Sequence, residues 1–226
     1  MADDPILALE GITFGYAGSP ALFDGLCFTL RPHERLGLYG PNGTGKTTLL
    51  RLIMGLETPQ RGAVLFHGEP VKDRQTLHRL RCRVGFVLQN SDDQLFSPTV
   101  LDDVAFGPLN LGLKRGAARD RAMETLESIG LGNLAERPTH HLSGGEKKMV
   151  SIASVLSMRP EALLLDEPTA FLDDDSRDRI ARILCGQNLA RIVVSHDKTF
   201  LDRTACSLVT IRQGAVTEFT CADAVT

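Results

Sequence analysis

The segment at residues 40–47, which reads Gly-Pro-Asn-Gly-Thr-Gly-Lys-Thr, constrains the fold of this chain more than any other feature. It matches the phosphate-loop pattern, in which a glycine, four residues and Gly-Lys are followed by Ser or Thr. The glycines let the backbone curl until successive N–H groups point at phosphate oxygens, and the helix that follows adds its positive end. We therefore predict a phosphate-binding loop made of Gly40, Pro41, Asn42, Gly43, Thr44, Gly45, Lys46, Thr47 and Thr48.

The residues on either side of this loop support the prediction. A short apolar run at 35–39 precedes the loop, and a helical pattern follows it over 46–54. A loop of this kind lies between a strand and a helix. We expect the Lys46 ammonium to reach the β- and γ-phosphates of a nucleoside triphosphate and the Thr47 hydroxyl to ligate Mg²⁺. We also expect the Thr48 hydroxyl to contact phosphate.

Two acids follow a second apolar run, in the sequence Leu-Leu-Leu-Asp-Glu-Pro at 163–168. Asp166, at the tip of a buried strand, suits a carboxylate that binds Mg²⁺ directly or through water. Glu167 lies where the strand ends and is placed to orient and polarise the attacking water. The simpler interpretation is that both acids end a strand and face solvent. The phosphate loop elsewhere in the chain favours the metal and water roles.

The order of apolar patterns predicts an α/β fold. Strand-like runs occupy 6–14, 25–30, 35–39, 62–66 and 84–88, and others return at 162–165, 191–194 and 207–211 with a helix at 176–184 between the first two. The patterns at 99–106, 115–129 and 146–157 have helical spacing, with no obvious strand between them. Strands that alternate with helices favour a mainly parallel sheet. We therefore expect a nucleotide-binding core at about 1–88 and 160–226, with a helical subdomain inserted at about 90–158.

Composition gives no support to several classes of protein. The formal charge of -3 and the pI of about 6.1 provide no electrostatic footprint for nucleic acid. The five cysteines are widely spaced and form no Cys-x-x-Cys pair, so we expect free thiols in a reducing cytoplasm and no zinc site. We expect no secretory signal at the N-terminus and no membrane-spanning helix, because no apolar run approaches the roughly 18 residues that a span requires.

Four further motifs connect this chain to a known family. Leu-Ser-Gly-Gly-Glu at 142–146 resembles the signature motif of ABC ATPases. Gln89, the pair Leu172-Asp173 and His196 appear in the order and at about the spacing of the Q-loop, D-loop and H-switch of that family. The resemblance covers nearly the whole chain. It implies a P-loop NTPase ABC cassette with a RecA-like core, an inserted helical subdomain and antiparallel β elements, forming a single ABC ATPase domain over residues 1–226.

The resemblance also implies a dimer with shared active sites. Ser143 can cap a helix, while Gly144 and Gly145 leave backbone N–H groups accessible at its positive end. In the family this signature, here Ser143, Gly144, Gly145 and Glu146, faces the γ-phosphate held by the other subunit. A head-to-tail pair with two bound ATP molecules is therefore implied, formed by two copies or with a related ATPase. Asp173 is expected to communicate across that dimer.

Other roles are carried over by position. Tyr16 looks like the aromatic residue that stacks on adenine, although a tyrosine that ends a strand is often only packed. Gln89 looks like the residue that touches Mg²⁺ or water and senses the membrane partner. His196 is expected to contact the γ-phosphate, although single histidines are usually structural. The expected catalytic set is Glu167, His196, Gln89 and Lys46, and the expected metal ligands are Thr47, Gln89 and Asp166.

The segment Gly-Phe-Val-Leu-Gln-Asn-Ser-Asp-Asp-Gln-Leu-Phe at 85–96 indicates a branch of the family. It resembles the Q-loop of energy-coupling-factor importers of cobalt, nickel, biotin and other vitamins, and the segments at 106–110 and 143–148 point the same way. The resemblance implies a transmembrane coupling subunit, a membrane substrate-binding subunit and a position on the cytoplasmic face of the membrane. The alternatives are an ATPase of another ABC transporter class or a soluble ABC ATPase that acts on nucleic acid or ribosomes.

This sequence departs from the family pattern at three places. Glu146 replaces the commoner glutamine of the signature, and we expect little effect. Phe171 occupies a position that is often held by a small residue, and the sequence offers no physical account of it. Many relatives continue into a C-terminal dimerisation domain, whereas a short tail follows Ile211 here. We therefore expect dimer formation to depend mainly on ATP and partners.

Overall fold

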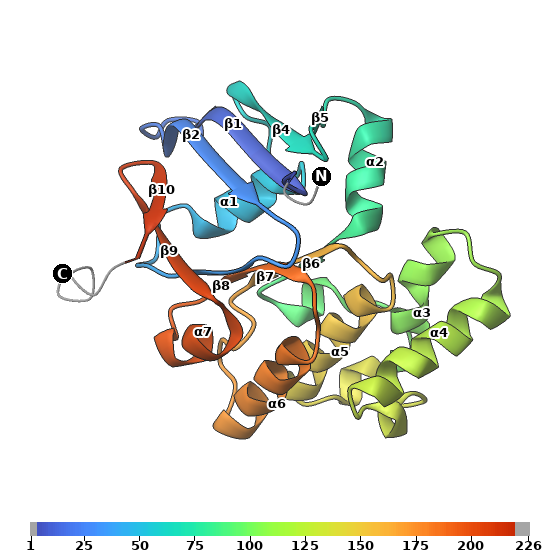
Figure 1. Cartoon of the computed structure of the whole chain (residues 1–226). Helices are drawn as coiled ribbons and strands as arrows, with labels where there is room; N and C mark the ends of the chain where they lie inside the picture. The colour runs from blue at the N-terminus through green and yellow to red at the C-terminus, as the bar shows by residue number, and fades with distance from the viewer. Residues whose placement is uncertain (1–3, 220–226) are drawn as a thin grey trace.

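The computed structural model describes residues 4–219, which form two sheets and a set of helices (Figure 1). In the described residues the larger sheet has the strand order β10-β9-β3-β8-β7-β6. Its strands are β3 (Arg35–Leu38), β6 (Val84–Val87), β7 (Ala162–Asp166), β8 (Ala190–Val194), β9 (Ser207–Arg212) and β10 (Ala215–Glu218). Strands β9, β3, β8, β7 and β6 pair in parallel with their neighbours, as the alternation of strands and helices predicts. Strand β10 pairs antiparallel with β9.

The register of the larger sheet brings the predicted motifs to one edge. Leu38 at the end of β3 and Asp166 at the end of β7 both pair with Val194, the last residue of β8. The phosphate loop, Glu167 and His196 come directly after these three strand ends. Since the carboxyl ends of parallel strands form a crevice where ligands bind, this register places the candidate site there.

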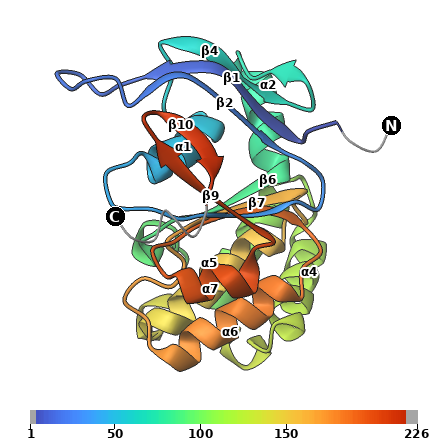
Figure 2. The same ribbon diagram turned by 60° about the vertical axis from the view of Figure 1, so that its left-hand side comes forward.

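The smaller sheet is antiparallel and has the order β2-β1-β4-β5. Its strands are β1 (Leu7–Phe14), β2 (Phe23–Leu30), β4 (Arg61–Phe66) and β5 (Glu69–Pro70). Helix α1 (Lys46–Ile53) lies between the two sheets (Figure 2). Its buried leucines share one hydrophobic cluster with residues of both sheets, among them Leu9 of β1 and Ile192 of β8.

The opposite face of the larger sheet is covered by helices. These are α3 (Val100–Asn110), α4 (Arg115–Ser128), α5 (Gly144–Leu156), α6 (Asp174–Cys185) and α7 (Lys198–Thr204), with the short helices η1 (Ser91–Asp93), η2 (Gly132–Leu134) and η3 (Thr139–His141). Strand β7 shows how the layers meet, because Leu163 and Leu165 belong to the cluster under these helices while Ala162 and Leu164 belong to the cluster around α1. This alternation is the two-residue period of a strand that is buried on both faces.

The segment between β6 and β7 contains only helical elements among those named. Its hydrophobic cluster is continuous with the sheet, since Val104 of α3, Ile152 of α5 and Leu163 of β7 belong to the same cluster. The division into a core at about 1–88 and 160–226 and a helical subdomain at about 90–158 stays a prediction. In the described part of the chain no helix is long and apolar enough to cross a membrane.

The sequence prediction lacked helices α2 (Arg74–Arg83) and α7, strands β5 and β10, and the short helices η1, η2 and η3. Helix α2 buries only Leu80, so it has almost no apolar stripe, and it begins instead at a capping box between Asp73 and Thr76. Strand β10 lies within the short tail expected after Ile211 and pairs antiparallel with β9. The end of that tail, at 220–226, lies outside the described residues, and so does Cys221. The other four cysteines are free thiols.

Candidate active site

The phosphate loop turns directly into α1. Gly43 has φ 82° and Gly45 has φ 98°, which is the left-handed region that favours glycine. Gly45 is also the N-cap of α1, and a Cβ at this position would lie 2.8 Å from Cζ of Phe23. Both backbone conformation and space therefore require glycine here. The result is a loop that leads into the positive end of a buried helix, which is an anion-binding arrangement.

Lys46 holds the loop in shape. Its ammonium donates hydrogen bonds to the carbonyl oxygens of Gly40 at 2.8 Å and Pro41 at 2.6 Å, and its residue is 6% exposed. Burial lowers the pKa of the Lys46 ammonium, and the neighbouring carboxylates of Glu167 and Asp166 oppose that shift. The loop thus carries a buried cation beside the phosphate-binding N–H groups.

Thr47 and Asp166 form the candidate magnesium site. The Thr47 hydroxyl donates a hydrogen bond to Oδ1 of Asp166 at 3.0 Å. Burial raises the pKa of the Asp166 carboxyl, and the bond from Thr47 opposes that shift. Both residues line a cavity of about 440 Å³, and Gln89 lines it too. A hydroxyl, a carboxylate and an amide oxygen are the hard oxygen ligands that Mg²⁺ takes beside phosphate and water, so these residues fit that ion.

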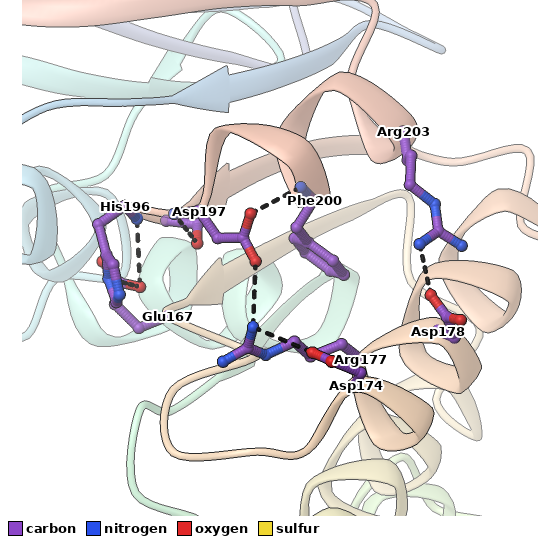
Figure 3. Close-up of polar contacts among 9 residues, drawn as sticks. Glu167, Asp174, Arg177, Asp178, His196, Asp197, Phe200 and Arg203 are labelled. Atoms are coloured by element: carbon purple, nitrogen blue, oxygen red, sulfur yellow. Dashed lines mark hydrogen bonds and ion pairs between the residues drawn. The ribbon is translucent and has the colours of Figure 1, made fainter.

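Glu167 and His196 face each other across the ends of β7 and β8 (Figure 3). His196 Nδ1 lies 3.0 Å from Oε2 of Glu167, and the His196 backbone N–H donates to the same oxygen at 3.4 Å. The Glu167 backbone is left-handed, with φ 44°, and its N–H donates to the Val194 carbonyl at 2.9 Å. Non-glycine residues held in such a conformation cluster at functional sites. The carboxylate is thereby aimed at the edge of the sheet where the motifs meet.

Lys46, Thr47, Glu167 and His196 line one cleft of about 1040 Å³, whereas Asp166 lines the neighbouring cavity. From the predicted set the cleft brings together Tyr16, Asn42, Gly43, Gly45, Lys46, Thr47, Thr48, Gln89, Glu167 and His196. The signature residues Ser143 to Glu146 and the D-loop residue Asp173 do not line it. The cleft therefore has room and polar groups for a nucleoside triphosphate, but it lacks the groups that the sequence prediction assigns to the opposite side of the phosphates.

Tyr16 lines the cleft. Its hydroxyl lies 3.2 Å from the Thr48 hydroxyl, and its ring packs edge-on against Phe14 with the ring centres 5.1 Å apart. The residue is still 47% exposed, so part of the ring is open to a ligand. The hydroxyl of Thr48, which is buried, has Tyr16 as a partner within the protein.

The signature residues begin α5. The Ser143 hydroxyl accepts a hydrogen bond from the Glu146 N–H, and the Glu146 carboxylate accepts one from the Ser143 N–H at 2.8 Å. Glu146 therefore completes a capping box, which glutamine can also form, and the expectation that this departure has little effect stays a prediction. Gly144 is exposed as expected, whereas Gly145 is buried, and a Cβ there would lie 2.2 Å from Oγ of Ser176. Gly145 therefore allows α5 to pack closely against α6.

Asp173 and Phe171 follow the acidic pair. The Asp173 carboxylate accepts a hydrogen bond from the Ser176 N–H at 2.7 Å and caps α6. Phe171 is 99% exposed, and its φ of 61° lies in the left-handed region that favours glycine. Asp173 is thus held by its own chain, and Phe171 stands free at the mouth of the cleft.

Two charged residues near the site were missed by the sequence reasoning. Arg177 of α6 lines the cleft and lies 3.8 Å from the Asp197 carboxylate (Figure 3). Lys148 of α5 is buried, and burial lowers its pKa to about 8, while Asp166 opposes the shift. Both sit on amphipathic helices, where a charge is normally solvated, so no local pattern marks them.

A phosphate loop, a Mg²⁺-compatible pair and a carboxylate aimed at the phosphate edge define a nucleoside triphosphatase of the P-loop class. The family described as ABC transporter matches residues 23–170 of this chain. The chain therefore belongs to the ABC transporter family and is an ATP-binding subunit that hydrolyses ATP. The predicted fold class, an α/β ABC cassette, is confirmed.

Named relatives agree with this family. A protein of Nitratidesulfovibrio vulgaris, provisionally named an ABC transporter ATP-binding protein, is 50% identical over 94% of this chain and 78% of its own length. The energy-coupling factor transporter ATP-binding protein EcfA of Methanocaldococcus jannaschii is 43% identical over 85% of this chain and 70% of its own. The nickel import ATP-binding protein NikO of Rhodobacter capsulatus is 45% identical over 94% and 87%. The predicted resemblance to the energy-coupling-factor branch is confirmed.

Solved structures show the same fold. The CbiO1 protein of Clostridium perfringens, described as part of the ABC transporter complex CbiONQ, superimposes with a TM-score of 0.84 and 34% identity, over 95% of this chain and 87% of that one. A dimeric bacterial ABC transporter cassette superimposes with a TM-score of 0.83 and 26% identity, over 94% and 97%. The cassette architecture thus extends over nearly all of this chain.

Proposed function

We propose that this chain is the ATP-binding and ATP-hydrolysing subunit of an energy-coupling-factor type importer. It powers uptake of cobalt or nickel ions, or of a vitamin such as biotin, through membrane partner subunits. The observation that carries the proposal is the identity of 43% to EcfA and 45% to NikO over most of the chain. The protein works at the cytoplasmic face of the membrane, bound to a transmembrane coupling subunit and a membrane substrate-binding subunit.

The cleft supports a specific division of labour in hydrolysis. The phosphate loop and Lys46 bind the β- and γ-phosphates, and Tyr16 stacks on adenine. The Glu167 carboxylate accepts a hydrogen bond from a water and orients its oxygen toward the γ-phosphorus. The new bond forms between that oxygen and phosphorus, the bond from phosphorus to the bridging oxygen of ADP breaks, and the proton that the water loses passes to the Glu167 carboxylate. Mg²⁺, when bound, neutralises charge on the phosphate oxygens.

His196 and Gln89 complete this arrangement on the chain's own side. His196 Nδ1 lies 3.0 Å from the Glu167 carboxylate, which supports a role in holding that carboxylate and in reaching the γ-phosphate with the other ring nitrogen. Gln89 is exposed and lines both the cleft and the neighbouring cavity, so its amide can contact Mg²⁺ or the attacking water.

A second subunit supplies the opposite side. Ser143 and Gly144 are exposed at the positive end of α5 and lie outside the lining of the cleft in their own chain. A helix N-terminus is a site for an anion. In the dimer that we propose, these residues face the γ-phosphate bound by the partner, and Asp173 lies at the interface. Two copies of this chain, or this chain and a related ATPase, form the pair.

An exposed aromatic surface, formed by two residues that follow Gln89 in the sequence, supports the membrane partner. Phe96 is 66% exposed, Phe106 is 43% exposed, and their ring centres lie 4.8 Å apart. The buried Asp103 carboxylate accepts hydrogen bonds from the N–H groups of Phe96 and Ser97, at 3.2 and 3.1 Å, and so holds this surface in place. Exposed aromatic residues that are held rigidly are typical of protein contact sites.

The test is co-purification of the tagged protein from detergent-solubilised native membranes, with the partners identified by mass spectrometry. We expect a transmembrane coupling subunit and a small integral substrate-binding protein. Phe96→Glu should reduce their recovery at least about tenfold, because a charge in the centre of an apolar contact costs more than 1.4 kcal/mol. Lys72→Glu, on an exposed loop before α2, is the control and should recover both.

Two outcomes would contradict the proposal. Recovery of soluble or ribosomal partners alone would remove the transport role and favour an ABC ATPase that acts on nucleic acid or ribosomes. Recovery of a transporter that works with a separate periplasmic binding protein would assign another transporter class. In both cases the nucleotide site would keep its assignment.

A further inference from the structure

A lysine is buried in α5 beside the segment that carries Gln89. Lys148 is 3% exposed and lies one helical turn beyond Gly144, the first residue of the helix. Its ammonium donates hydrogen bonds to the carbonyl oxygen of Leu88 at 2.8 Å and to that of Gln89 at 2.7 Å. An ammonium group is rarely buried unless its partners are well placed. The two carbonyls on either side of the Gln89 backbone are therefore fixed to α5.

The backbone N–H of Leu88 is also held by a hydrogen bond. The Leu88 N–H donates a hydrogen bond to Oε1 of Gln94 at 3.0 Å, and the Gln94 amide donates to the Ser151 carbonyl of α5 at 2.9 Å. The backbone just before Gln89 is thus tied to α5 through both its donor and its acceptor. The Gln89 side chain, by contrast, is exposed toward the cleft and the neighbouring cavity.

We propose that Lys148 is a positioning residue for Gln89. Its two hydrogen bonds orient the backbone from which the Gln89 amide reaches Mg²⁺ or the attacking water. Because Lys148 and Ser143 lie on the same helix, the Gln89 of one site and the signature residues offered to the partner's site move as one rigid unit. The inference rests on the role proposed above for Gln89. It adds a residue that touches neither nucleotide nor metal but sets where Gln89 lies.

A double-mutant cycle on the purified full-length chain separates positioning from plain stabilisation. The variants are Lys148→Met, Gln89→Ala and their combination, and the readouts are kcat and KM for MgATP. Methionine keeps the length of the side chain and removes its donors. We expect Lys148→Met to lower kcat about tenfold, as loss of a positioning contact does, with KM changed less than about twofold.

The combination carries the decisive result. If Lys148 acts through Gln89, adding Lys148→Met to Gln89→Ala should lower kcat by less than about twofold more, because coupled residues are not additive. Losses that multiply would overturn the inference and leave Lys148 a purely structural residue. Unchanged turnover in Gln89→Ala alone would instead remove the role proposed for Gln89, and the inference with it.

Neighbouring substitutions provide the controls. Lys147→Met removes the next lysine, whose pair with the exposed Asp92 is 2.6 Å long, and it should leave kcat within about twofold because exposed ion pairs contribute little. If Lys148→Met does not fold, as judged by its thermal transition, Lys148→Gln replaces it in both backgrounds. Glutamine keeps N–H donors on a shorter side chain, so we expect a smaller kcat loss that again vanishes without Gln89. An equal loss in both backgrounds would reject the inference.

Discussion

At the scale of single residues, two residues that line the cleft have an unfavourable backbone conformation. Glu167 has φ 44° and Phe171 has φ 61°, although neither is glycine. A left-handed backbone costs a residue with a side chain about 1–2 kcal/mol. For Glu167 this conformation turns a buried carboxylate toward the edge of the sheet where the phosphate loop lies. Phe171 gains no burial in return, since it is 99% exposed.

Phe171→Gly should therefore stabilise the chain. We expect the free energy of unfolding to rise by about 0.5–1 kcal/mol, which is the relieved strain less the extra entropy that glycine gives the unfolded chain. Urea unfolding followed by circular dichroism measures this change. Phe171→Ala is the matched control, because it removes the ring but keeps the strained backbone, and it should be near neutral. A glycine variant no more stable than the alanine variant would contradict the explanation.

At the scale of one element, the start of α5 depends on ionisation of Glu146. Hydrogen bonds from Ser143, led by its backbone N–H, lower the pKa of the Glu146 carboxyl below its ordinary value of 4.5, and Arg137 adds to the shift. The folded chain therefore binds fewer protons here than the unfolded chain. The stabilisation is present above pH 4.5 and is lost as the pH falls through the lowered value.

Glu146→Gln tests this pH dependence of stability and also introduces the glutamine that is commoner in the family signature. Glutamine can close the same capping box but carries no charge at the helix start. At pH 7 we expect wild type to be more stable by about 0.5 kcal/mol, a typical charge–dipole contribution. The difference should shrink toward zero as the pH falls below 4.5. Chemical unfolding of both proteins from pH 7 to pH 3 measures it, and a gap that does not vary with pH would refute this account.

At the scale of the whole molecule, strand register assembles the cleft, and the dimer proposed above would complete it. Strands β3, β7 and β8 bring the phosphate loop, Asp166 and His196 to one edge, while the signature residues at the start of α5 do not line the cleft. ATP hydrolysis and dimer formation should therefore be linked. In the proposed dimer, bound ATP would favour association of the two chains, and its conversion to ADP and phosphate would release them.

Glu167→Gln should separate the two events. Glutamine keeps the shape of the side chain but cannot act as a carboxylate toward water, so we expect kcat to fall about 100-fold or more. The variant should still bind ATP and should elute as a dimer in size-exclusion chromatography with MgATP. Lys46→Ala should lose ATP binding and remain monomeric under the same conditions. Near-normal hydrolysis by Glu167→Gln would assign the water-orienting role to another residue.

Local sequence determined the parts of the site that depend on short segments. The loop at 40–47 and the acids at 166 and 167 could be identified because glycine spacing and a strand end set the backbone within a few residues. The helix cap at Ser143 is local for the same reason. The family likeness then supplied roles for Tyr16, Gln89 and His196, which stay predictions at the level of chemistry.

Only the tertiary structure decided how distant segments share one environment. The burial of Lys148 under Leu88 and Gln89, the packing of Gly145 on Ser176, and the exposure of Phe171 each depend on contacts or free space that no periodic pattern records. The separate antiparallel sheet and strand β10 arise likewise from pairing between distant or weakly patterned strands. Local propensity acts over a few residues, whereas burial and strand pairing join residues that are far apart in the chain.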